Sequence, residues 1–224
     1  QGQRVTSSVT VTLSRDTTND MMFPSKGSKA SVSVQHAGIP FGGNTEFTRY
    51  GGSAAWYYSI YGEVVFGVKG RIGYLQSNHG KSLPIYERYV LGGINSLRGL
   101  RYIGPEDELV LRRKYSNTGV PEGYEVIKNP VGTSDVMGGT SMLSGSLEVV
   151  FPLIREAGIK GVVFYDTGNT WNGHYRPDDL RHTVGTGVRW QSPIGPLRLE
   201  YGYVLDRRDN EKAGRWEFTI GMFM

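Results

Sequence analysis

Apolar and polar residues alternate along most of this chain with a period of two. Threonines separate Val9, Val11 and Leu13, and a serine separates Val32 from Val34. A period of two is the pattern of a β-strand with one apolar and one polar face, and helical periodicity is nearly absent. The pattern therefore predicts an all-β protein.

The alternation recurs in seven further segments. Most of them set β-branched or aromatic residues against glycine, serine, threonine or charged residues. They lie at about 45–61, 64–74, 143–151, 161–171, 184–191, 197–206 and 216–222. Most segments are about ten residues long, which is the length that a tilted strand needs to cross a bilayer. Short turns alternate with longer polar connections, so we predict about nine antiparallel strands with two different rims.

The polar face of these strands carries charges opposite an apolar stripe. These charges are Lys69, Arg71, Glu148, Arg189, Arg198, Glu200 and Glu217. In a soluble β-sandwich or a lipocalin-like barrel the charged face would be the outside, whereas in a membrane barrel it lines the lumen. Periodicity alone leaves both open. Strand length and the tyrosines and tryptophans near strand ends favour an antiparallel transmembrane β-barrel.

Composition is consistent with this fold class. The 224 residues include 32 glycines and 14 tyrosines, and the mean hydropathy of −0.35 averages a lipid-facing and a lumen-facing set. No run reaches the roughly 18 apolar residues of a membrane helix. The net charge of +4 is spread along the chain. The densest basic cluster, at 112–114, lies in a predicted loop, so we expect no nucleic-acid partner.

Catalytic and metal-binding patterns are not evident. The chain has no cysteine, and its four histidines lack metal-ligand spacing. No nucleophile elbow occurs, and no nucleophile–base pair stands out. We expect no enzymatic activity, no metal and no cofactor.

The most informative segment is the glycine-rich stretch at 92–101, between two predicted strands. It places Arg98 in a Ser-Leu-Arg-Gly frame at the start of a long polar connection. Connections beyond about 15 residues tend to be functional or disordered. Taken alone, the Arg98 side chain could lie in water or in the barrel lumen, and a solvated loop arginine is the simpler interpretation.

Several motifs, in order along the chain, favour one of these two environments. Leu97, Arg98, Gly99 and Leu100 form a loop motif, and residues 146–148 resemble the strand that follows such a loop. Residues 164–171 contain Asp-x-Gly-x-x-Trp, 192–197 form a Ser-Pro-x-Gly-Pro turn, and 216–224 resemble a closing strand. Together these motifs resemble the BamA family of outer-membrane barrel-assembly insertases over most of the chain.

The resemblance implies that a long loop at about 92–138 folds back into the lumen. There its arginine would meet acidic groups of the inner wall, by position Glu148 and Asp166. An arginine in a partly dry lumen needs such carboxylates to offset its desolvation. The resemblance also implies a weak seam whose one side is the terminal strand, with Trp216, Phe218, Gly221, Phe223 and Met224; we further expect Gly221 to weaken pairing there.

The implied function is insertion and folding of β-barrel proteins in the bacterial outer membrane, by strand pairing at the seam and without a cofactor. The implied partners are the lipid bilayer, unfolded β-barrel clients, and accessory lipoproteins that bind periplasmic POTRA domains, which this chain does not contain. Residues 1–224 are thus expected to be the carboxyl-terminal portion of a larger barrel, or a shortened barrel. A protein-translocating or passive outer-membrane pore of related type is the alternative.

Overall fold

Nine strands form one antiparallel sheet in the computed structural model, which confirms the predicted fold class. The strand order is β1-β2-β3-β4-β7-β8-β9-β10-β11. The structure describes residues 5–80, 83–105, 109–115, 118, 121–128, 136–193, 195–208 and 211–221, with only the backbone described for 109–115 and 121–128. The strands of the sheet are β1 (Ser8–Asp16), β2 (Gly27–Ala37), β3 (Phe47–Tyr61), β4 (Val64–Ser77), β7 (Ser141–Ile154), β8 (Ile159–Trp171), β9 (Arg181–Ser192), β10 (Gly195–Val204) and β11 (Gly214–Ile220).

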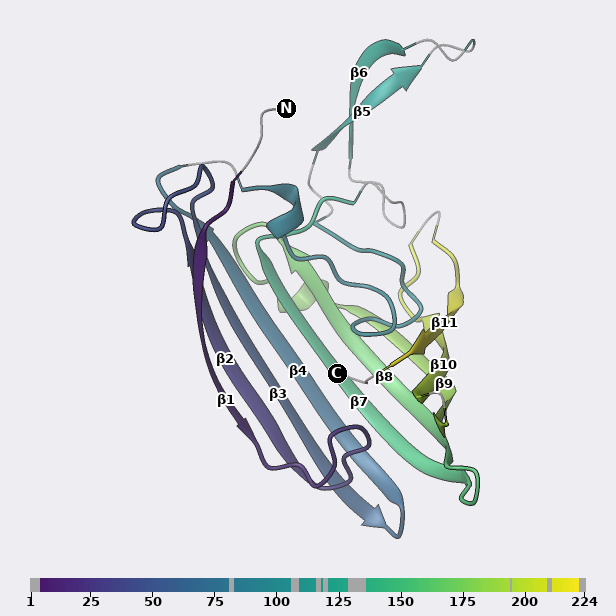
Figure 1. Ribbon diagram of the computed structural model, residues 1–224. Coiled ribbons are helices and arrows are strands. Elements are labelled where there is room, and N and C mark those ends of the chain that lie inside the picture. Colours follow the sequence, from purple (N-terminus) through teal and green to yellow (C-terminus); the bar gives the residue numbers. More distant parts are fainter. Residues whose placement is uncertain are drawn as a thin grey trace.

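The sheet is strongly curved, with β1 and β11 at its two ends (Figure 1). Within the described residues, β1 pairs only with β2 along its length, and β11 pairs only with β10. Two short 3₁₀ turns, η1 (Ile85–Glu87) and η2 (Pro177–Asp179), are the helical elements of this part of the chain. No helix there is long and apolar enough to cross a membrane.

The two rims differ, as the sequence predicts. Connections of two to four residues, at 62–63, 155–158 and 193–194, join strands at one rim. Longer connections, at 38–46, 78–140, 172–180 and 205–213, join strands at the other rim. The exception is the β1–β2 turn at 17–26, which is long although it belongs to the short-turn rim.

The longest connection does not form a single lumen-inserted loop over 92–138. Strands β5 (Leu109–Tyr115) and β6 (Pro121–Lys128) pair as a separate two-stranded sheet within it. In Figure 1 this hairpin stands beyond the end of the nine-stranded sheet, while the segment that precedes it lies on the concave side. The rest of the predicted loop, at 106–108 and 129–135, lies outside the described residues.

Burial is inverted relative to a soluble protein. The largest exposed side chains include Val11, Leu13 and Phe218, of which Leu13 is 74% exposed, whereas Asp166 and Glu200 are fully buried on the concave side. A soluble sandwich would bury the apolar stripe, because burial of apolar surface drives its folding. The opposite arrangement fits strands that present apolar residues to lipid and polar residues to a lumen.

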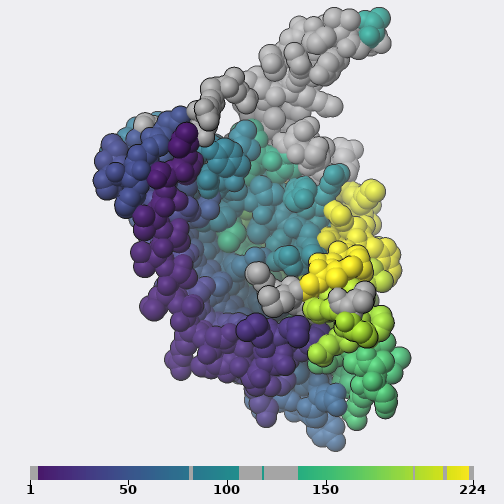
Figure 2. Space-filling view, in the orientation of Figure 1, coloured from purple at the N-terminus to yellow at the C-terminus, as the bar shows by residue number. Residues whose placement is uncertain are grey.

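The β1–β2 turn folds over the lower end of the concave side (Figure 2). Asn19 accepts the backbone N–H groups of Ser25 and Lys26 at 3.0 and 2.9 Å. The N–H groups of Phe23 and Met22 donate to Asp20 and lower the pKa of its carboxyl. These bonds fix the turn in a defined shape, in which the Phe23 ring centre lies 4.7 Å from Lys160 Nζ.

The inverted burial predicts how a charge on the outer face would act. Leu147 lies near the middle of β7 on the outer face and is 43% exposed. We expect Leu147→Arg to reduce the stability of the folded protein in liposomes by about 2–4 kcal/mol, the typical depth-dependent cost of a lipid-facing arginine at mid-bilayer. Urea titration of the liposome-refolded protein measures this. Leu147→Ala is the control, and equal losses for both variants would contradict the lipid-facing assignment.

Candidate functional site

The segment that carries the predicted arginine motif forms a narrow loop on the concave side. Leu91 and Ile103 bridge its two arms with a pair of backbone hydrogen bonds of 3.3 and 2.8 Å. The Gly93 N–H donates to the Leu100 carbonyl at 2.9 Å, which closes the arms further along. The tip at 94–99 is therefore directed toward the inner wall of the sheet. We call residues 91–103 the arginine loop.

Two leucines of the motif hold the arginine loop by apolar packing. Leu97 and Leu100 are buried together with Leu91 and Ile103 of the same loop and with Val204 of β10. Apolar packing of this kind is non-directional, so it fixes the depth of the loop in the lumen but not the direction of Arg98.

The Arg98 guanidinium is almost completely buried, and each of its five N–H groups can be matched to one acceptor. Nε and Nη2 donate to the two oxygens of Asp166 at 2.7 and 2.5 Å, a bidentate pair. Nη1 donates to Glu148 at 2.7 Å and to Glu200 at 2.8 Å. Nη2 also donates to Ser146 Oγ at 2.9 Å. The structure thus brings Arg98 together with Glu148 and Asp166, the two residues that the sequence pointed to.

Two further contacts fix the orientation of this arginine. Its backbone N–H donates to Asp166 Oδ2 at 3.1 Å. Its guanidinium carbon lies 3.5 Å from the centre of the Phe164 ring, within the range of a cation–π interaction. Asp166 therefore holds both the backbone and the side chain of Arg98.

The acids around Arg98 are shared with cations of the wall. Arg189 Nη2 lies 2.8 Å from Glu148, and its Nε lies 2.8 Å from Glu200. Arg198 Nη2 lies 2.9 Å from Glu200. Lys69 Nζ lies 3.2 Å from Glu148 Oε2. Positive and negative groups alternate in this network, so no buried charge in it stands alone.

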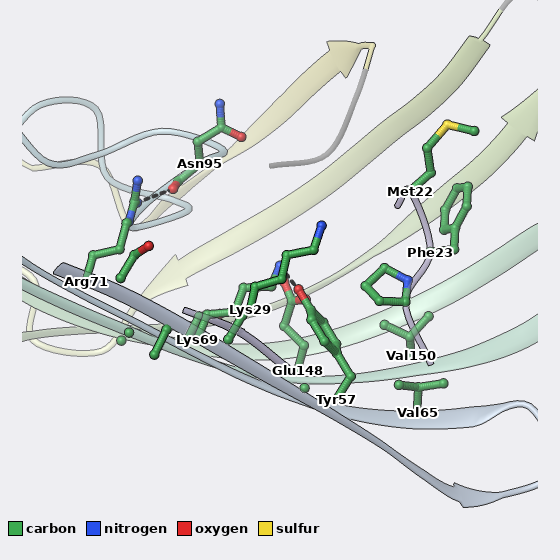
Figure 3. A pocket seen from close by; sticks show the side chains of 18 of the residues that line it. Met22, Phe23, Lys29, Tyr57, Val65, Lys69, Arg71, Asn95, Glu148 and Val150 are labelled. Carbon is green, nitrogen blue, oxygen red and sulfur yellow. Dashed lines mark hydrogen bonds and ion pairs between the residues drawn. The ribbon is translucent and has the colours of Figure 1, made fainter. Parts of the chain in front are cut away.

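The network lines one side of a lumen cavity of about 630 Å³. Figure 3 shows Lys69, Glu148 and Tyr57 there, with Met22 and Phe23 of the β1–β2 turn farther along it. Arg71 also borders the cavity and donates to the backbone carbonyl of Asn95 in the arginine loop. The described part of the chain contains no group of three His, Cys, Asp or Glu side chains placed to hold a metal ion.

Glycines allow the arginine loop to lie directly against β10. A Cβ atom at Gly202 would lie 2.4 Å from the carbonyl carbon of Arg98, and one at Gly99 would lie 2.6 Å from that of Gly202. Gly99 also has a φ of +95°, which L-residues with side chains rarely adopt. Gly99 is therefore required in the motif by both conformation and space.

Sequence reasoning missed three contacts of Arg98: Glu200, Ser146 and Phe164. Each lies on a strand predicted from alternation, and Glu200 belongs to the predicted polar face. The alternation does not single them out, because it marks every inward polar position in the same way. The five N–H donors of the guanidinium point in fixed, divergent directions, so acceptors on several strands were to be expected, but the sequence does not say which polar residues lie there.

The terminal-strand residues are placed separately from this network. Trp216 and Phe218 lie on the outer face and are exposed. Gly221 follows the end of β11 with a φ of +122°, and its N–H donates to the Pro196 carbonyl at 2.9 Å. The backbone conformation after the strand thus explains why residue 221 is a glycine, and weak packing within the strand does not. Phe223 and Met224 lie outside the described residues.

The inverted sheet and the arginine sealed into its concave side define an outer-membrane β-barrel protein with a loop docked in its lumen. The chain belongs to the Omp85 superfamily, because the model of the Omp85 superfamily domain matches residues 1–224. This membership, together with the relatives below, assigns it to the bacterial outer membrane.

Its relatives confirm the resemblance to the BamA family. The chain is 30% identical to the outer membrane protein assembly factor BamA of Nitratidesulfovibrio vulgaris, over all of this chain and 26% of that protein. It is 23% identical to BamA of Neisseria meningitidis serogroup B, over 95% of this chain and 28% of that protein. The crystal structure of Haemophilus ducreyi BamA lacking POTRA domains 1–3 superposes with a TM-score of 0.76 at 26% identity, over 96% of this chain and 42% of that one. The chain therefore spans about a quarter of the curated relatives' length.

The Arg98 network predicts a large effect of its removal. Arg98→Ala leaves Glu148, Asp166 and Glu200 without their shared cation, and removing one partner of a buried pair typically costs about 3–5 kcal/mol. We expect the refolded protein to lose its heat-modifiable gel mobility at a lower temperature. For Arg98→Lys we expect a transition temperature between those of the wild type and Arg98→Ala, because lysine keeps the charge but has fewer N–H donors and no planar guanidinium. If Arg98→Ala lost its folded gel mobility at the same temperature as the wild type, this account of the network would be wrong.

The close approach at Gly202 predicts that one methyl group there displaces the loop. We expect Gly202→Ala to expose the buried Arg98, seen as new trypsin cleavage after this residue in the folded protein. Gly70→Ala is the matched control, since a Cβ there meets only one atom, at 3.9 Å. Equal cleavage of the two variants would show that the loop does not depend on this contact.

Proposed function

We propose that this chain is the membrane part of an assembly factor that inserts and folds β-barrel proteins into the outer membrane. The observation that carries the proposal is the edge of β11. Within the described residues this edge is unpaired, and it lies beside a wall that the arginine loop holds together. The BamA relatives, which are named as outer membrane protein assembly factors, support it.

The strands β7 to β10, which form the wall beside the arginine loop, are joined by more interactions than the terminal strand β11. The Arg98 network joins β7, β8, β9 and β10 through Glu148, Asp166, Arg189 and Glu200. β7 and β8 share thirteen paired positions. β10 and β11 share seven. Since each pair adds to the stability of a sheet, β11 is the strand that leaves this wall most easily.

The free edge of β11 has a definite set of backbone groups. Gly221 donates to Pro196, and Val204 donates to the Ala213 carbonyl, so odd-numbered residues of this segment face β10. The N–H and C=O groups of Trp216, Phe218 and Ile220 therefore face away from β10.

A client strand that pairs with these groups gains hydrogen bonds that hydrocarbon cannot offer it. This is strand addition at a sheet edge, carried out inside a membrane. It needs no cofactor and no covalent chemistry. Unfolded β-barrel proteins are accordingly the clients that we propose, and accessory lipoproteins are proposed partners of the intact protein.

The edge geometry predicts a selective effect of proline at position 218. Phe218→Pro removes an N–H that faces away from β10, so it should leave the β10–β11 pairing in place while it removes one bond to a client. We expect client insertion into liposomes to slow by about fivefold, the value of one hydrogen bond of about 1 kcal/mol. Phe218→Ala removes the same ring but keeps the N–H, and serves as the control. If both variants insert clients at the same rate, β11 is not the pairing edge.

A further inference from the structure

We propose that Glu217 of β11 couples docking of the arginine loop to pairing of the terminal strand. In this arrangement the docked loop keeps β11 on β10, and an undocked loop releases it. The proposal deepens the function proposed above and rests on it for the meaning of β11 movement. The coupling itself is a property of the described contacts.

The first observation is a pair of opposed acids. Glu217 of β11 lies directly across from Glu200 of β10 in the sheet register. Both carboxylates are buried on the concave side. Like charges at directly opposed positions destabilise strand pairing, so this pair needs compensation from elsewhere.

Glu200 has ample compensation within the wall. It accepts hydrogen bonds from Arg98 at 2.8 Å, Arg189 at 2.8 Å, and Arg198 at 2.9 and 3.0 Å. Two of these three cations belong to the sheet, but Arg98 belongs to the arginine loop. Docking therefore also supplies part of the positive charge that Glu200 sees.

Glu217 depends on the loop much more. The backbone N–H groups of Gly99 and Ile94, both in the arginine loop, lie toward its carboxylate, and a Cβ atom at Gly93 of the same loop would lie 3.7 Å from its Oε2. The half-exposed Arg215 lies 3.4 Å from its Oε1. This oxygen is buried and has no hydrogen bond among the described residues. Apart from Arg215, the groups that compensate Glu217 thus belong to the arginine loop, and they are in place only while the loop is docked.

The consequence is a reciprocal linkage. When the arginine loop leaves, Glu217 loses two donors and Glu200 loses one cation, and the two carboxylates then face each other across β10 and β11. Pairing of β11 is weakened as a result. By the same linkage, a partner that draws β11 away removes the acceptor of the Gly99 and Ile94 N–H groups and loosens the loop.

The competing view is that Glu217 is an ordinary lumen charge. Glu217→Gln separates the two views, because a glutamine side chain keeps an oxygen that accepts N–H bonds but carries no charge to repel Glu200. With this variant β11 should stay paired whether or not the loop is docked.

The experiment is hydrogen–deuterium exchange of the β11 backbone in the intact protein refolded into liposomes. The proteins compared are wild type, Arg98→Ala, Glu217→Gln and the double variant. We expect Arg98→Ala to speed exchange in β11 about tenfold, within the usual range of coupling between sites. In the Glu217→Gln background the same change should speed it less than about twofold. Equal acceleration in both backgrounds would overturn the proposal.

Two controls keep the result decisive. If Arg98→Ala does not fold, Gly99→Ala undocks the loop through the backbone contact with Gly202 and retains the arginine. Thr219→Val changes a neighbouring inward position of β11 without touching its charge, and should leave the acceleration intact. Exchange reports strand pairing and not client insertion, so the coupling can fail while the proposed function holds. Conversely, failure of the client-insertion test would leave the exchange result standing.

Discussion

Burial of one guanidinium organises this structure. A buried arginine is unfavourable unless each donor and its charge are compensated, and Arg98 meets both conditions through three carboxylates and one hydroxyl. The acids stand on three different strands, so their shared cation fixes the spacing of those strands as well as the position of the loop. The direction of Arg98 and the order of the charges around it follow from this one set of bonds, while apolar packing of Leu97 and Leu100 sets the depth of the loop.

The balance of the fold is uneven along the sheet. The strands around Arg98 are joined by side-chain bonds as well as by their ladders. The terminal strand has a shorter ladder and an acid that faces another acid. A sheet that is firmly joined in β7 to β10 and weakly joined at β11 would suit the proposed function, in which β11 pairs with a client strand. The stabilising side-chain bonds are thus concentrated in β7 to β10 and not in the terminal strand.

Much of this could be predicted from the sequence, for identifiable reasons. Alternation with a period of two placed all nine strands, since a strand with two different faces leaves a strong local pattern. The motif around Arg98 pointed to Glu148 and Asp166 only through its resemblance to a family. The role of Glu200 could not be predicted, because alternation makes every lumen acid equivalent and only the three-dimensional register distinguishes them. The β5–β6 hairpin was missed because the basic residues at 112–114 interrupt any apolar stripe, and the place of Gly221 depends on a backbone angle that no pattern encodes.

The apolar outer face has a consequence for the life of the chain before it reaches the membrane. Segments such as those around Val11, Leu13 and Phe218 are β-prone and apolar on one face. In water they would pair with one another, as exposed strand edges do. A chain built this way is prone to aggregate in water, so its time in an aqueous compartment has to be short. If the chain acts as proposed, it is itself one of the β-sheet proteins that its activity serves, so copies already in the membrane would speed the insertion of new ones.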